Sequence, residues 1–333
     1  MILVENYTLA VLLCVLAMIC WGSWQNTQNL AGKNWRFELF YWDFILGIFL
    51  FSLIMAFTFG SMGTSGRPFI EDLRQASPPH LFNAALGGAI WNLGTLLLIA
   101  AISIAGMSVA FPIGGGIGWI LGIVINYIGK PEGNPWFLFG GSAVIVLAIL
   151  FSVVSYRKLA TAQHKAPKKG ILLSFAAGIL IAFFYRFVAS ALDTTFVPEE
   201  SGKITSYTAV VIFSIGAIIS TFIFNPFFMR RPIQGEPVSM KDYFRGTGKA
   251  HLFGLLGGAI WCLGNSVSFM AVGAASPAIS YGLSNSAPVV AALWGIFVWK
   301  EFRDAPAGTS KWLVFMFVCY IVGLGLIVYS KLA

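Results

Sequence analysis

The chain has 333 residues, of which 58% are hydrophobic and only 10% are charged, with a formal net charge of +8. Soluble domains are about half apolar and about a quarter charged, so this composition excludes a water-soluble globular protein and indicates an integral membrane protein in a lipid bilayer. The positive charges lie in a few connections between apolar runs, so they do not indicate nucleic-acid binding. All four cysteines lie inside apolar runs without metal-ligand spacing, and we expect no disulfide, metal site or cofactor.

Apolar runs long enough to cross a bilayer, which takes roughly 20 residues, follow one another along the chain. We predict an all-α protein with ten transmembrane helices, at 7–26, 40–59, 81–104, 107–127, 136–156, 170–190, 207–227, 251–271, 277–298 and 312–330. The first run is too long for the apolar part of a signal peptide and has no Lys or Arg before it. We therefore expect it to be the first membrane helix.

The basic residues are distributed unequally between the two sides of this arrangement. Of the 21 Lys and Arg residues, fifteen fall in odd-numbered connections, five fall in the others or at the C-terminus, and Arg186 lies within a run. The positive-inside rule then places the odd-numbered connections in the cytoplasm and both termini outside. We expect a monomer or homodimer in a bacterial inner membrane.

A nine-residue segment recurs in the two halves of the chain. LGGAIWNLG at 86–94 returns as LGGAIWCLG at 256–264, with eight identities at an offset of 170 residues. This repeat predicts two five-helix units, 1–158 and 170–333, joined by a basic linker at 159–169. Because five is odd, the second unit must enter the membrane inverted, as in secondary transporters whose solute site lies between the repeats.

The repeat also predicts a contact between the fourth and ninth helices. On the fourth helix, small residues recur every four positions, at Gly114, Gly118 and Gly122. Their repeat equivalents on the ninth helix are Ser284, Pro288 and Ala292. Small faces allow close helix packing. The alternative is that glycine is simply common in membrane helices.

Several segments resemble one known family: CWGSWQNTQNL near the start, ELFYWDF, FNPFFMRRPIQG, GGAIWCLGNSVSFM and APVVAALWGIFVWKEFR. They are similar to the plant ureide permeases of the drug/metabolite transporter superfamily, near the bacterial glucose/ribose porters and the L-rhamnose–proton symporter. The resemblance implies a non-enzymatic, proton-coupled importer of a small polar solute, either a ureide or nucleobase or a monosaccharide. The chain departs from the plant pattern in its short central loop, in Asn285 for Gln, and in Arg186 for Pro.

Polar and aromatic side chains inside apolar runs are candidates for the solute site, because polar groups are expensive in hydrocarbon. The candidates are Trp24, Trp91, Asn92, Thr95, Trp119, Arg186, Trp261, Asn265, Tyr281 and Asn285. Amides and hydroxyls suit neutral solutes, and aromatic rings suit flat heterocycles or sugar faces. The alternatives are hydrogen bonds between helices for Thr95 and Asn265, and an interface belt for Trp24.

Two charged residues lie within the predicted helices. Asp43 is the candidate proton-coupling carboxylate, and the alternative is an interfacial acid paired with Lys33 or Arg36. Arg186 is expected near the outer interface, where it either pairs with Asp193 or contacts the solute.

Catalytic motifs are absent from the sequence, as is a nucleotide-binding motif that would indicate ATP drive. The leading prediction is a proton-coupled importer that works by alternating access. A drug or metabolite exporter is the alternative, while a non-transporting receptor would not need an inverted repeat.

Overall fold

The computed structural model describes residues 1–32, 35–63, 65–105, 107–159, 168–194, 202–232 and 235–333. Across these residues the chain is helical, with a single isolated bridge between Leu192 and Ile204, so the all-α prediction is confirmed. Nine of the described helices are long and apolar enough to cross a membrane, and a tenth apolar helix, Ile113–Gly129, is shorter. Most of the predicted linker, 160–167, lies outside the described residues.

The helices begin and end within a few residues of the predicted runs. In chain order they are α1 (Tyr7–Ser23), α2 (Asn26–Ala31), α3 (Phe37–Phe57), α4 (Phe69–Gln75), α5 (Pro78–Ala105), α6 (Met107–Gly129), α7 (Pro135–Leu159), α8 (Lys168–Ala191), α9 (Ser206–Arg230), α10 (Met240–Phe244), α11 (Gly248–Met270), α12 (Val272–Ala275), α13 (Pro277–Ser284), α14 (Pro288–Leu293), a π-helical turn (Trp294–Val298) and α15 (Thr309–Tyr329). The ninth predicted helix is broken between α13 and α14, where Pro288 cannot continue the hydrogen-bond ladder.

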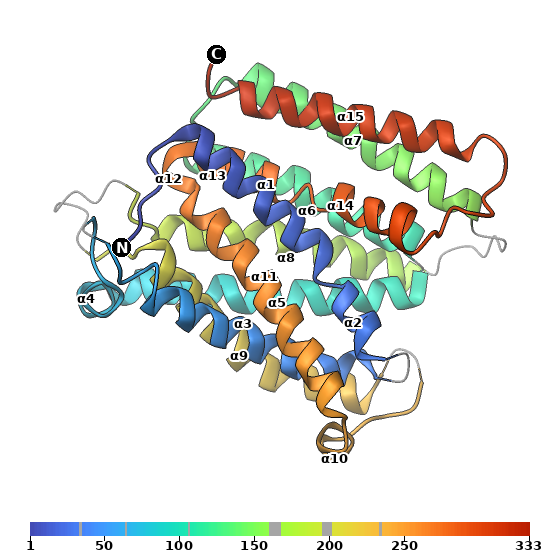
Figure 1. Cartoon of the computed structure of the whole chain (residues 1–333), viewed down its shortest axis with the longest axis horizontal. Coiled ribbons are helices and arrows are strands. Elements are labelled where there is room, and N and C mark those ends of the chain that lie inside the picture. Colours follow the sequence, from blue (N-terminus) through green and yellow to red (C-terminus); the bar gives the residue numbers. More distant parts are fainter. Residues whose placement is uncertain (33–34, 64, 106, 160–167, 195–201, 233–234) are drawn as a thin grey trace.

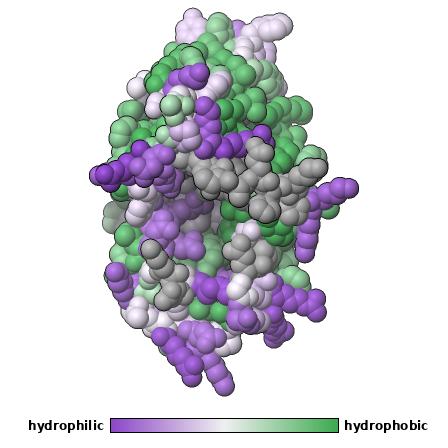
Figure 2. All heavy atoms as spheres, turned by 90° about the vertical axis from the view of Figure 1, so that its right-hand side faces the viewer, coloured by the Kyte–Doolittle hydropathy of each residue, from purple (hydrophilic) through white to green (hydrophobic). Residues whose placement is uncertain are grey.

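The long helices run side by side, with α7 and α15 paired along one flank and α3 and α9 on the other (Figure 1). Both termini and α4 lie at one end of the bundle, which we call the terminal end. The opposite end carries α2 and α10, and we call it the α10 end. Hydrophilic residues gather on the α10 end, while hydrophobic residues cover the flanks beside it (Figure 2). This distribution matches a bundle whose flanks face lipid.

The repeated glycines pack helices of the two units against one another. A Cβ atom on Gly88 of α5 would collide with the Phe213 carbonyl of α9, and a Cβ on Gly258 of α11 would collide with the Phe44 carbonyl of α3. Two further glycines make the reciprocal contacts: Gly216 against Ala85, and Gly47 against Leu255. The two helix pairs thus meet backbone to backbone, which only glycine permits.

Gly258→Ala is therefore expected to destabilise the protein by about 1–3 kcal/mol, because the new methyl group must push α3 away. Gly88→Ala should have a similar effect at the equivalent contact. The measurement is the thermal unfolding midpoint in detergent. Gly325→Ala on α15 is the control, since nothing lies within 4 Å of its Cβ position. Equal midpoints for the Gly258 and Gly325 variants would contradict the packing role.

The fourth and ninth predicted helices contact each other as predicted, and one of the three glycines takes part in the contact. Tyr281 of α13 donates to the Gly118 carbonyl at 2.7 Å, and its ring covers Gly122. The Gly114 and Gly118 Cβ positions instead face α8, whose backbone they approach at Ser174 and Gly178. The small face of α6 is therefore divided between α13 at Gly122 and α8 at Gly114 and Gly118.

An ion cluster at the terminal end joins α4 and the segment before it to the connection between α8 and α9. The Arg67 guanidinium contacts Asp72 at 2.9 Å and Asp193 at 2.6 Å, and both carboxylate side chains are fully buried. Asp72 also accepts from the Thr205 amide at 2.8 Å. Burial lowers the pKa of the guanidinium, but its hydrogen bonds to the two carboxylates outweigh this and shift the pKa upward. The cluster joins α4 to the chain between α8 and α9.

Candidate functional site

A cavity of about 200 Å³ lies between the two units. It is lined by the end of α1, the second half of α5, the first half of α6, the middle of α7, α8, α11, α13 and α15, and the break between α13 and α14. Among the described residues, its lining contains no Asp, Glu, Lys, Arg or His. An uncharged, largely aromatic cavity suits a neutral solute.

Seven of the ten predicted solute-site residues line this cavity: Trp24, Trp91, Thr95, Trp119, Trp261, Tyr281 and Asn285. They lie on α5, α6, α11 and α13 or directly after α1 and α13, and they are up to 261 positions apart in the sequence, since 285 − 24 = 261. The cavity therefore collects most of the polar and aromatic candidates in one place. Asn92, Asn265 and Arg186 lie elsewhere.

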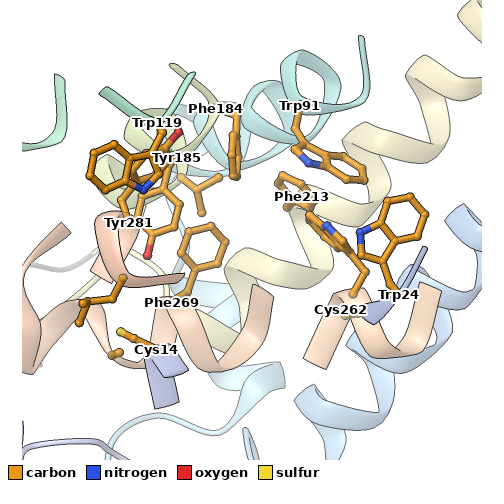
Figure 3. Packing of buried hydrophobic residues seen from close by; sticks show 14 of the residues in the cluster. Cys14, Trp24, Trp91, Trp119, Phe184, Tyr185, Phe213, Cys262, Phe269 and Tyr281 are labelled. Carbon is orange, nitrogen blue, oxygen red and sulfur yellow. The ribbon is translucent and has the colours of Figure 1, made fainter. Parts of the chain in front are cut away.

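Two equivalent tryptophans of the repeat meet at the centre. The rings of Trp91 and Trp261 have centroids 4.1 Å apart, and Phe213 stacks on Trp261 at 5.7 Å. Trp24 stacks on Phe44 at 4.4 Å and continues the aromatic wall (Figure 3). The two occurrences of the repeated motif, 170 positions apart in the sequence, thus meet at the cavity.

Three of these tryptophans have indole N–H groups with no acceptor among the described residues: Trp24, Trp91 and Trp261. The other cavity tryptophans are satisfied, because Trp21 donates to the Trp261 carbonyl at 3.2 Å and Trp119 donates to the Gly282 carbonyl at 3.1 Å. None of these three nitrogens is among the fully enclosed unpaired atoms, and all three residues line the cavity. The cavity thus offers three hydrogen-bond donors to a ligand.

The break in the ninth helix supplies polar groups. Asn285 follows α13, and its amide nitrogen donates to the Tyr281 carbonyl at 3.2 Å. That bond directs the amide and leaves its oxygen as an available acceptor beside the cavity. Ser286 donates back to the Gly282 carbonyl at 2.9 Å. Backbone breaks of this kind occur in membrane helices where they line a cavity.

A second aromatic group closes the cavity toward the terminal end. Tyr281 and Trp119 lie beside Tyr185, Phe184 and Phe269 (Figure 3). Tyr281 bonds to the Gly118 carbonyl, and Tyr185 bonds to Ser280 at 2.9 Å. These bonds join α6, α8 and α13 across the bundle. The solute space therefore lies in the half nearer the α10 end.

Two of the three predicted site asparagines, Asn92 and Asn265, are fully buried outside the cavity. Asn92 accepts from Tyr41 at 2.6 Å and donates to Ser220 at 2.8 Å, so it joins α3, α5 and α9. This is the interhelical role that such residues have in membranes. Neither amide atom of Asn265 has a partner among the described residues.

Arg186 does not pair with Asp193, which is held by Arg67. Its guanidinium lies against Gly129, at the C-terminal end of α6, where the helix dipole favours a cation. Arg186 is half-buried and does not line the cavity.

Asp43 is buried, with a 4% exposed side chain. Its carboxylate accepts from the Tyr243 hydroxyl at 2.6 Å and contacts His251 Nδ1 at 2.9 Å. The alternative partner Arg36 is bonded to Glu38, and Lys33 lies outside the described residues. Phe44, the next residue, stacks against Trp24 and lies 6.4 Å from Trp91, so α3 packs behind two residues that line the cavity.

The sequence interpretation missed several cavity residues: Ser152, Ser286, Pro288 and Tyr320. Pro288 carried a usable signal, because proline inside an apolar run predicts a break with free backbone groups. A tyrosine in mid-membrane, such as Tyr320, is also a polar group that needs a partner. Ser152 carried no signal.

The ureide permease family model matches residues 40–169 and 157–330. Ureide permease 1 of Arabidopsis thaliana is 25% identical over 391 residues, covering 99% of both chains. A protein of Streptococcus pyogenes serotype M6 that is named for sugar uptake is 24% identical over 308 residues, covering 83% of this chain and 96% of the other. One crystal structure is similar in fold, with a TM-score of 0.59 at 16% identity and coverage of 96% and 97%.

Proposed function

The chain belongs to the ureide permease family, and from that premise we propose that it is a secondary transporter that imports a small neutral solute by alternating access. As a family member it is an integral membrane transport protein and not an enzyme. The single observation that carries the proposal is the uncharged aromatic cavity with three unpaired indole N–H groups between the two units. These donors can bind the carbonyl or hydroxyl oxygens of a neutral solute.

The inverted-repeat arrangement is supported by the pairing of helices. The contact of α5 with α8 has its counterpart in α11 with α1, and that of α11 with α3 has its counterpart in α5 with α9. Three further contacts each join a helix to its own equivalent in the other unit: α3 with α9, α6 with α13, and α7 with α15. Both termini lie at one end, as an even number of crossings requires. We therefore assign ten spans, with α6 as the fourth and α13–α14 as the ninth.

The distribution of charge supports an inward-facing state. If the basic α10 end is cytoplasmic, both termini face outward. The cavity then lies in the cytoplasmic half, and the Tyr281 and Tyr185 contacts close the outer side. Export would use the same geometry, so a transport measurement must establish the direction.

Proton coupling is assigned to Asp43. It is a buried carboxylate whose partners, Tyr243 and His251, are polar but not permanently charged. A carboxylate in this setting can gain and lose a proton during transport, unlike one paired permanently with Arg or Lys. Among the described residues, the cavity lining contains no carboxyl or imidazole group, so protonation of Asp43 would act on the solute site indirectly, through α3 and through α11, which carries His251 and the lining residue Trp261.

The proposed function is tested by a thermal-shift screen of the purified protein against allantoin, uracil, xanthine and monosaccharides. We expect one of these neutral solutes to raise the unfolding midpoint in a concentration-dependent way. Stabilisation by a ureide or nucleobase, or by a sugar, would identify the solute class. Stabilisation by lipophilic cations alone would overturn the importer proposal in favour of drug efflux.

Trp91→Phe is expected to weaken solute binding about 5- to 10-fold, because the ring remains but one hydrogen-bond donor is lost. Trp261→Phe should behave similarly at the equivalent position. The measurement is the dissociation constant of the solute found in the screen, by titration calorimetry. Trp136→Phe is the control, since Trp136 is 85% exposed and lies outside the cavity. Unchanged affinity in both cavity variants would exclude the indole donors from binding.

A further inference from the structure

Three titratable side chains meet where α3, α10 and α11 converge at the α10 end. Asp43 is held by Tyr243 at 2.6 Å and by His251 at 2.9 Å. The Asp43 side chain is 4% exposed, whereas that of His251 is 26% exposed. A buried proton carrier is therefore in direct contact with a group that reaches water.

We propose that His251 is the proton-exit residue, which takes the proton from Asp43 and releases it to water at the α10 end. This inference rests on the proposed coupling role of Asp43. In the step, the O–H bond of protonated Asp43 breaks and an Nδ1–H bond forms on His251. The imidazolium then loses its Nε2 proton to water, and the neutral ring can reset for the next proton.

The surroundings of the ring favour this route. Nε2 lies beside Gly246, where a Cβ atom would come within 2.6 Å of it. Because residue 246 is glycine, no side chain at that position covers Nε2. Trp35 and Tyr243 pack edge-on against the imidazole, with ring centroids at 5.3 Å and 4.8 Å. The ring is thereby held with Nδ1 toward Asp43 and Nε2 toward the α10 end.

Tyr243 is a positioning residue in this arrangement. Burial and the nearby Asp43 carboxylate raise the pKa of its phenol above the usual range, so the hydroxyl keeps its proton and acts as the donor. Its hydrogen bond fixes Oδ1 and leaves Oδ2 for His251. It also docks α10 onto α3, which ties the loop helix to the coupling carboxylate.

Other charged groups flank the cluster from α3, α10, α11 and their connections: Arg36, Glu38, Lys241, Asp242, Arg245 and Lys249. Arg36 is paired with Glu38, and Asp242 accepts from Ser239 in the cap of α10. Among the described residues, Asp43 is the only carboxylate that pairs with His251. The flanking charges set the local field, but none replaces Asp43 as the proton donor.

The repeat provides an internal comparison. His80 occupies the first turn of α5, as His251 does in α11, but it contacts Ser77 and the Gly202 carbonyl, each at 2.8 Å. A histidine at this point of the fold thus needs no carboxylate partner for structure. The Asp–His pair is specific to the α10 end, which is the side where an importer must release its proton.

The test is proton flux in proteoliposomes that contain the pH dye pyranine, with uracil, allantoin and glucose each tested as the added solute. His251→Gln keeps a hydrogen-bond donor for Asp43 but cannot carry a proton. We expect it to slow proton release about tenfold or more, because a positioned proton acceptor contributes at least that much to a transfer. His80→Gln, the matched control, should keep the wild-type rate. A wild-type rate in His251→Gln would overturn the inference.

Two further variants separate the possible failures. If Asp43→Asn keeps its proton flux, the coupling role of Asp43 fails, and the exit route fails with it. If Asp43→Asn loses the flux but His251→Gln does not, only the exit role is wrong.

Tyr243→Phe should shift the pH profile of uptake without abolishing flux, and an unchanged profile would exclude its positioning role. Thermal midpoints of all variants show that each is folded.

Discussion

Asp43→Asn is expected to abolish solute accumulation driven by a pH gradient. With one proton per solute, the wild-type protein should concentrate the solute about tenfold for each pH unit, because a tenfold ratio and one pH unit represent the same free energy. Asparagine keeps the size and an acceptor oxygen for Tyr243 or His251 but cannot bind a transferable proton. The variant should therefore only equilibrate the solute across the membrane.

The measurement is uptake by proteoliposomes with an imposed pH gradient, repeated with an imposed sodium gradient. Asp304→Asn is the control, since Asp304 is exposed in the connection before α15. Accumulation by Asp43→Asn under the pH gradient would remove Asp43 from the coupling role. Accumulation by the wild type under sodium alone would assign the coupling to a different ion.

Arg67→Met is expected to destabilise the folded protein by about 3–5 kcal/mol, because it removes the cation that contacts both buried carboxylates. Asp72 and Asp193 have fully buried side chains, and each forms an ion pair with this guanidinium. Methionine fills part of the same volume, so most of the effect should be electrostatic. The thermal unfolding midpoint in detergent measures it.

A matched control for Arg67 lies on α4. Arg74 is exposed, and Arg74→Met should leave the midpoint nearly unchanged. Adding Asp72→Asn and Asp193→Asn to Arg67→Met should recover part of the loss, since two buried negative charges are removed. If Arg67→Met unfolds at the wild-type temperature, the cluster does not stabilise the terminal end.

The positions of the helices could be predicted because the bilayer imposes a local rule. A run of roughly 20 apolar residues must satisfy its own backbone, and only a helix does so within one segment. The predicted runs consequently lie within a few residues of the helices α3, α5 and α11. The ninth run was the exception, because Pro288 breaks a helix without interrupting the apolar pattern.

The candidate site was predicted in part because the repeat identified its centre. Trp91 and Trp261 are identical in sequence context, and the structure brings their rings within 4.1 Å. Asn92, one residue further, has the same intramembrane polarity as a site residue but faces α3 and α9. Lipid and protein interior are both apolar, so hydrophobic patterning does not distinguish the buried face of a membrane helix.

By itself the sequence determined the membrane location, the helical spans, the repeated motif and a set of polar residues from which the site is drawn. The tertiary structure alone decided which partners those residues have. Asp43 meets Tyr243 and His251 from 200 and 208 positions away, and Arg67 meets Asp193 from 126. Spans are fixed by transfer of local segments into lipid, whereas hydrogen-bond partners depend on which helix faces are packed together.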